Sequence, residues 1–237
     1  MKPRYALLGL ATIGMVYGFS WATRMPGDAV QGESARIISV HVPTAWLAFL
    51  AFGMTAVFGI AWLVTKHARA DHLAAASAEV GVLFTGLALI TGMIWGKATW
   101  GIAWDWGDAR LASTAMMFFV YLGYLALRRA TPDPTQRARR SAVLGAIGAL
   151  QVPLVYFSVN IWRTLHQTQS VRPDGASMPT ETLISMLVNL AAFTILYLGL
   201  LVWRADQLRF EEARLAQTHL TPNAGAAVIP PKLQPGS

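Results

Sequence analysis

A short tryptophan-rich segment holds the residues of this chain that are best suited to binding chemistry. Residues 100–110 contain Trp100, Trp104, Trp106, Asp105, Asp108 and Arg110, and apolar segments flank them on both sides. Two carboxylates are costly in hydrocarbon, so we expect a loop outside the core of a bilayer or against protein. Three indole faces so close together form a platform suited to a large, flat, apolar molecule.

Two histidines could complete such a site. His41 precedes Pro43 at the start of one apolar span, and His166 follows another. His166 lies four residues after Trp162, so the two share a face if the helix continues. Neutral imidazole is a good iron ligand, and two of them could hold a haem iron from both sides. The alternative is that each histidine is an interfacial polar residue or a structural hydrogen-bond partner.

Four cations are expected on the same side as this pair. Arg36, Lys97, Arg110 and Arg163 follow or precede apolar spans there, and each could pair with a haem propionate. Snorkelling or ordinary loop solvation is the alternative explanation for each of them.

The elements that must position these residues are membrane helices. The chain has 237 residues, of which 54% are hydrophobic and only 13% charged, and its mean hydropathy is +0.44. Such a composition is typical of a membrane protein. Six apolar segments each have about the ~20 residues that a membrane-spanning helix needs. They cover residues 5–23, 42–65, 78–96, 111–127, 141–162 and 182–203. The sequence therefore predicts an all-α integral membrane protein with six transmembrane helices.

The distribution of cations predicts the orientation. Of the 19 Lys and Arg residues, 13 lie in the N-terminus, the second and fourth connections and the C-terminal tail. The positive-inside rule makes that side cytoplasmic, with both termini inside and the tryptophan-rich loop, residues 97–110, outside. Topology also explains the net charge of +7 better than nucleic-acid binding does.

The chain divides into a membrane domain, residues 1–203, and a cytoplasmic tail, residues 204–237. Residues 204–219 can form a charged helix, and the proline-containing remainder is expected to be disordered. The pairs Gly14/Gly18 and Gly92/Gly96 are interpreted as helix-packing residues. Trp21, Trp62, Trp95 and Trp203 are interpreted as members of interfacial belts.

Several chemistries are missing from the sequence. The chain has no Cys, which excludes disulfides, thiolate metal sites and covalent haem attachment through C-x-x-C-H. It has no P-loop, H-E-x-x-H or G-x-S-x-G motif in a fitting context. We therefore expect no enzyme, and any ATP hydrolysis should come from a partner.

The motifs together resemble the heme exporter protein C family, the haem-handling C subunit of the cytochrome c maturation system. This family carries a tryptophan-rich "WWD" loop, and the chain is similar to it over residues 25–205. The resemblance rests on Ala35–Pro43, on Thr164–Gln167, and on Trp100, Gly101, Trp104, Trp106, Asp108, Arg110 and Leu111. Gly107 is an extra residue relative to the family pattern, and we predict that Asp108 is the family aspartate.

The resemblance implies a function. Haem b would be bound transiently at the periplasmic face of a bacterial inner membrane, with His41 and His166 as axial ligands. The platform would comprise Trp100, Gly101, Trp104, Trp106, Asp108 and Arg110. Haem would pass to a periplasmic haem chaperone. The implied partners are an ATP-binding subunit, a second membrane subunit and a small single-span subunit of an ABC-type haem-export complex.

Two other classes share some of these features. A bis-histidine membrane cytochrome for electron transfer would retain its haem, and such proteins usually place ligand pairs within the helical bundle. A haem lyase shares the WWD loop, but those relatives are as a rule much larger and carry further histidines and spans.

Overall fold

The computed structural model describes residues 3–25, 27–28, 31–168, 170–172 and 175–220. These residues form a helical bundle with one short hairpin. The elements in chain order are α1 (Pro3–Ala22), η1 (Glu33–Ile37), α2 (Ile38–Thr65), α3 (Ala68–Trp100), α4 (Ala109–Ala130), α5 (Pro134–Ala149), α6 (Gln151–Ile161), β1 (Val171–Arg172), β2 (Gly175–Ala176) and α7 (Thr180–Leu220). The two strands pair antiparallel.

The predicted set of spans is confirmed. Within the described residues, six helical segments are long and apolar enough to cross a membrane, and α5 and α6 together form one of them. The break between these two lies at Leu150. Pro153 has no amide hydrogen to donate back to Ala149, so the regular ladder is interrupted at that point.

Helix ends follow local sequence signals. Asp108 caps α4 by accepting from the Leu111 backbone N–H, and Asp133 caps α5 in the same way. Pro134 occupies the first turn of α5, where a missing amide hydrogen costs nothing. Gly101 ends α3 with a φ of 74°, a conformation that glycine adopts without strain.

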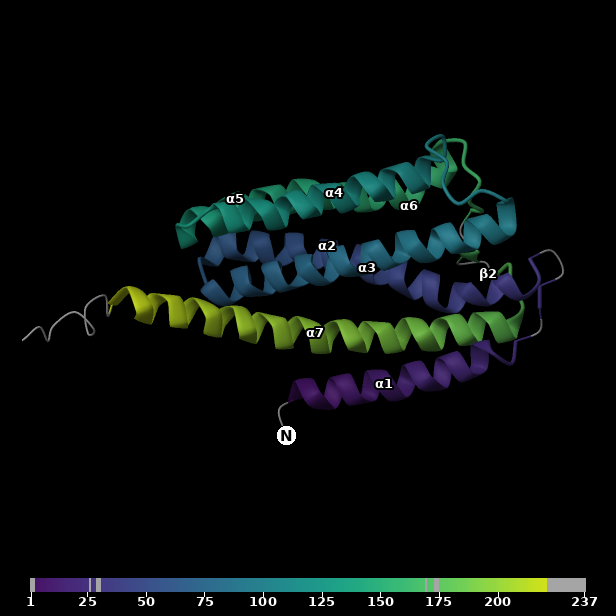
Figure 1. Cartoon of the computed structure of the whole chain (residues 1–237), viewed down its shortest axis with the longest axis horizontal. Helices are drawn as coiled ribbons and strands as arrows, with labels where there is room; N and C mark the ends of the chain where they lie inside the picture. The colour runs from purple at the N-terminus through teal and green to yellow at the C-terminus, as the bar shows by residue number, and fades with distance from the viewer. Residues whose placement is uncertain (1–2, 26, 29–30, 169, 173–174, 221–237) are drawn as a thin grey trace, which may run out of the picture.

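The helices are arranged in three groups (Figure 1). Helices α2 and α3 lie in the middle and pack extensively against each other. Helices α4, α5 and α6 cover one side of this pair, while α7 covers the other and carries α1 on its outer face. Two apolar clusters fill the spaces, one around Phe84 and Phe193 and one around Phe52 and Tyr121, whose rings stack at 3.6 Å.

Small residues allow α1 to approach α7 closely. A Cβ on Gly14 would lie 2.9 Å from the Cβ of Ala192, and one on Gly18 would overlap the Asn189 side chain. The packing interpretation of Gly14 and Gly18 is therefore confirmed.

The two ends of the bundle differ in character. One end has both the start of α1 and the end of α7, which extends beyond the other helices (Figure 1). The charged helix expected over residues 204–219 is the continuation of α7 to Leu220, and the disorder expected beyond it falls on residues 221–237, outside the described part of the chain. The opposite end has loop 101–108 and the described parts of the connections 23–37 and 162–179, and the candidate site lies there.

Candidate functional site at the loop end of the bundle

His41 lies one turn into α2 and faces α3. Its Nδ1 lies 3.0 Å from the Thr91 hydroxyl oxygen. The Thr91 hydroxyl donates its own hydrogen to the Leu87 carbonyl at 2.8 Å, so Nδ1–H of His41 is the donor to Thr91. Gly92 lets the ring approach, because a Cβ there would lie 3.0 Å from His41 Cε1.

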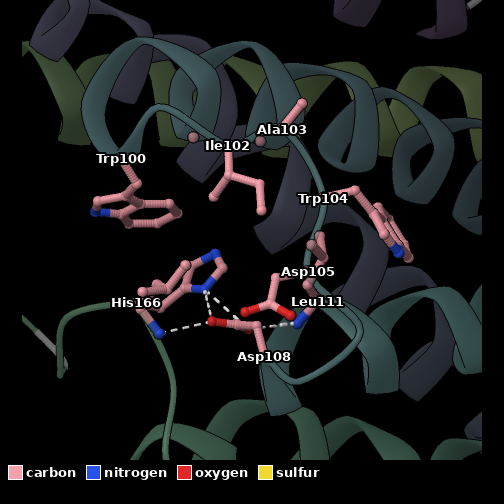
Figure 2. Close-up of a pocket in the computed structure, with 11 residues that line it drawn as sticks. Trp100, Ile102, Ala103, Trp104, Asp105, Asp108, Leu111 and His166 are labelled. Carbon is pink, nitrogen blue, oxygen red and sulfur yellow. Dashed lines mark hydrogen bonds and ion pairs between the residues drawn. The ribbon is translucent and has the colours of Figure 1, made fainter.

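His166 is held by Asp108, whose side chain is buried and only 2% exposed. The His166 Nδ1 lies 3.1 Å from each Asp108 carboxylate oxygen. The same carboxylate accepts from the Leu111 N–H, the Thr164 hydroxyl and the Leu165 N–H at 2.9, 2.6 and 2.7 Å. Asp108 therefore ties the start of α4 to the segment that carries His166 (Figure 2).

The electrostatics of this pair fix its protonation. Burial alone would raise the pKa of Asp108, but hydrogen bonds from Thr164, Leu111 and His166 and the His166 charge lower it to about 2. Burial lowers the pKa of His166 below its usual value, although Asp108 opposes the shift. At neutral pH, a carboxylate thus accepts the Nδ1 hydrogen of a neutral imidazole. The lone pair is then on Nε2, which faces the space between Trp100 and Ile102 (Figure 2).

Two tryptophans connect the histidines. The ring centroids of His41 and Trp95 are 5.7 Å apart, those of Trp95 and Trp100 are 6.0 Å apart, and those of Trp100 and His166 are 5.0 Å apart. We call this series, His41–Trp95–Trp100–His166, the aromatic ladder. It brings the two predicted ligands into one site, although their sequence positions are far apart.

Trp95 is a site residue that the sequence analysis missed. Its belt interpretation is wrong, because the side chain is only 8% exposed and its indole N–H donates to the Gln31 amide oxygen at 2.9 Å. Trp62 is also buried. The signal was the helical spacing of Thr91, Gly92 and Trp95, which becomes evident once α3 is extended to Trp100.

Gly92 and Gly96 also have a role beyond helix packing. A Cβ on Gly96 would lie 3.1 Å from the Ile102 carbonyl and 3.2 Å from the Trp100 ring. Both glycines therefore make room for ladder residues, and interpreting them as packing residues alone is wrong.

The tryptophan-rich loop is shorter than expected. Helix α3 includes Lys97 and Trp100, and α4 includes Arg110, so only residues 101–108 lie between the helices. Helix α6 ends at Ile161, so the helix face expected for Trp162 and His166 does not exist. His166 lies in the connection after α6. Its position is set by hydrogen bonds to Asp108 instead of by a helix.

The three tryptophans of the segment do not form one flat surface. Trp100 contacts His166, whereas Trp104 and Trp106 contact each other edge to face at 4.9 Å. Trp104 lies across the pocket from Trp100 (Figure 2), and Trp106 is 74% exposed. Gly107 gives its backbone N–H to the Asp105 carboxylate at 2.8 Å, so Asp105 shapes the turn while Asp108 holds the histidine.

The pocket between these groups is almost filled. It is lined by Trp100, Ile102, Trp104, Leu165 and His166, among others, and its cavity volume is about 10 Å³. This is room for about one water molecule. A macrocycle can reach both histidines only if Trp100 or loop 101–108 moves.

The four predicted cations differ in their availability. Arg36 donates to the Met25 carbonyl at 2.6 Å and pairs with Glu33, and Lys97 donates to the Gly101 carbonyl at 2.9 Å. Arg110 donates to the Tyr156 carbonyl at 3.0 Å, and its buried Nε has no hydrogen-bond partner within the described part of the chain. Arg163 is exposed. Arg110 is thus the cation nearest to the Asp108–His166 pair, and it retains a donor to offer.

Fold and site together define a multi-pass helical membrane protein with two histidines and several tryptophans clustered at one end. The family model described as "Heme exporter protein C" matches residues 2–219. The chain belongs to the heme exporter protein C family.

Individual relatives agree with the family match. The chain is 42% identical over 195 residues to heme exporter protein C of Bradyrhizobium diazoefficiens, covering 82% of this chain and 74% of the relative. It is 36% identical over 228 residues to heme exporter protein C of Haemophilus influenzae, covering 92% and 91%. It is 38% identical over 198 residues to a cytochrome c biosynthesis ccmC-like mitochondrial protein of Marchantia polymorpha, covering 81% and 83%.

Proposed function

We propose that this chain binds haem b at the periplasmic face of a bacterial inner membrane and passes it to a periplasmic haem chaperone for cytochrome c biogenesis. His41 and His166 are the axial ligands. Trp100, Trp104 and Trp106 contact the macrocycle, and Arg110 and Arg163 are the cations best placed for propionates. Asp108 acts through His166.

The aromatic ladder is the observation that carries this proposal. Each of its terminal imidazoles uses Nδ1 in a hydrogen bond to protein, and this leaves Nε2 as the nitrogen for iron. Both groups belong to one site at one end of the bundle, as an axial pair requires.

The shape of the site supports transfer over storage. A pocket of about 10 Å³ must open to admit haem, and a loop that opens for entry also permits release. A bis-histidine cytochrome holds its haem permanently, so the exposed rim around Trp106 favours delivery.

The sidedness of the site follows from charge. Of the 17 Lys and Arg residues that the structure describes, 11 lie at the end of the bundle opposite the site, so we assign that end and residues 204–237 to the cytoplasm. We assign energy supply to an ATP-binding partner, which acts with a second membrane subunit and a small single-span subunit.

The test is an absorption spectrum of the purified protein, oxidised and reduced, for the wild type, His41→Ala and His166→Ala. We expect sharp low-spin bands in the wild type, their loss in both variants, and failed transfer to the added chaperone. His67→Ala is the matched control, because His67 lies in the turn before α3 at the opposite end. Unchanged spectra and transfer in both site variants would remove the histidines as ligands, and haem retained in the presence of chaperone would favour the cytochrome.

A further inference from the structure

The two histidines of the ladder have unlike hydrogen-bond partners. His166 donates to a carboxylate, and His41 donates to a neutral hydroxyl. A hydrogen bond to a carboxylate raises the basicity of a histidine that binds a metal. Replacing the hydrogen-bond partner of such a histidine typically alters metal affinity by about 10–100-fold. If both imidazoles bind one haem iron, the partner of His166 would therefore strengthen its bond to iron more than the partner of His41 would.

The carboxylate at His166 is fixed in place. Asp108 is buried, and its two oxygens accept from the start of α4 and from Thr164 and Leu165 in addition to His166. This network spans the two chain segments that meet at the site, so the carboxylate cannot turn away without breaking several hydrogen bonds. The hydrogen bond from His166 to Asp108 is consequently charge-assisted, and it also orients the His166 ring.

The hydroxyl at His41 provides orientation without charge. Thr91 is committed to its own helix through the Leu87 carbonyl, and only its oxygen lone pairs serve His41. The ring also contacts Trp95 and has a hydrogen bond with the Ala88 backbone, and both of these partners are neutral.

We infer that the two iron–histidine bonds are unequal: His166, backed by Asp108, anchors the haem, and His41, backed by Thr91, is the ligand that exchanges first. In this exchange, the bond from iron to His41 Nε2 breaks and a bond from iron to the incoming ligand forms. The lone pair of the broken bond stays on the His41 imidazole, the incoming ligand supplies the lone pair of the new bond, and the iron keeps its oxidation state. This inference rests on the proposed function and makes Asp108 and Thr91 positioning residues.

Cyanide is the probe that tests the order of exchange. The full-length protein, loaded with ferric haem, is titrated with cyanide and followed by electron paramagnetic resonance. His41→Ala with cyanide gives the reference spectrum for haem held by His166, and His166→Ala with cyanide gives the reference for haem held by His41. We expect the wild-type adduct to match the His41→Ala reference.

Thr91 variants test the cause of the inequality. Thr91→Val removes the hydroxyl that accepts from His41 while leaving its backbone partner Ala88 in place, and it should lower the cyanide concentration at half-conversion by about 10-fold. Thr91→Ser keeps the hydroxyl and should behave like the wild type. This comparison needs no change at Asp108, whose replacement could disturb folding.

The outcomes separate the inference from the function on which it rests. A wild-type adduct that matches the His166→Ala reference, or an equal mixture of the two, would overturn the inference while leaving haem binding by both histidines intact. Equal half-conversion concentrations for Thr91→Val and Thr91→Ser would overturn the role of Thr91. Haem spectra that neither histidine variant alters would refute the proposed function itself.

Discussion

At the scale of single residues, Asp108 decides the geometry of the site more than any tryptophan does. It caps α4, orders the segment before His166, and accepts the hydrogen of its imidazole. Because one buried carboxylate makes all three interactions, its charge contributes to the stability of the fold as well as to the orientation of the His166 ring. The sequence resemblance assigns Asp108 to the haem platform, whereas the structure shows it hydrogen-bonded to His166, the proposed ligand.

The depressed pKa of Asp108 predicts a pH dependence. A carboxyl group with a usual pKa of 3.8 and a folded-state pKa of about 2 stabilises the fold above pH 4 and loses that contribution as pH falls toward 2. We expect Asp108→Asn to lower stability by roughly 2 kcal/mol at neutral pH, with the difference from wild type shrinking below pH 4. Thermal unfolding between pH 7 and pH 3 measures this. Asp105→Asn, in the same loop, is the control, and a difference that stays constant with pH would contradict the assignment.

At the scale of elements, α3 contributes most to the site. Thr91, Gly92 and Trp95 lie against His41 of α2, and Trp100 at the end of α3 contacts His166. The glycine at 92 matters because it removes a side chain where the His41 ring must lie. Helix α3 therefore sets the distance between the ring of His41 and the rest of the ladder.

Gly92→Ala tests this role of α3. The added methyl group would lie 3.0 Å from His41 Cε1, so the ring must shift. We expect haem retention to fall about 10-fold, as is typical when the support of a ligand is altered. Gly86→Ala on the same helix is the matched control, because its Cβ would have an ordinary contact with Phe118 at 3.6 Å. Equal haem titrations for the two variants would show that the space at Gly92 is not required.

At the scale of the whole molecule, ion pairs and hydrogen bonds join the helices at the end opposite the site. Arg128 on α4 donates to both carboxylate oxygens of Asp71 on α3, and the Nη2–Oδ2 distance is 2.8 Å. Its Nη1 also donates to Ser141 of α5 at 2.8 Å. Arg204 of α7 binds Glu79 of α3 in the same region. These bonds hold α3, α4, α5 and α7 together at this end of the bundle.

Arg128→Met separates stability from haem binding. The change leaves the buried Asp71 carboxylate without its cation, which typically costs about 3–5 kcal/mol. We expect lower stability in denaturant titrations but an unchanged haem spectrum in the protein that remains folded. Arg129→Met, at an exposed neighbouring position, should change neither. An altered haem spectrum in Arg128→Met would mean that the two ends are coupled.

Local sequence patterns are enough to predict the class of the protein and most of the residues in its candidate site. Apolar runs of bilayer length define membrane helices whatever their neighbours are, and the spans were predicted correctly for that reason. The two histidines and the tryptophan-rich segment were also evident, because their residue types are unusual beside such spans. These are local properties, and local patterns predict them.

How these residues meet depends on contacts between segments that lie far apart in the sequence. Thr91, Trp95 and Gln31 belong to the site through contacts between α2, α3 and the connection before α2, and no local pattern distinguishes a buried tryptophan from one at the interface. The role of Asp108 likewise depends on His166, which lies 58 residues away along the chain. Packing of helices distant in sequence sets such partners, and helix periodicity alone does not specify which helices pack.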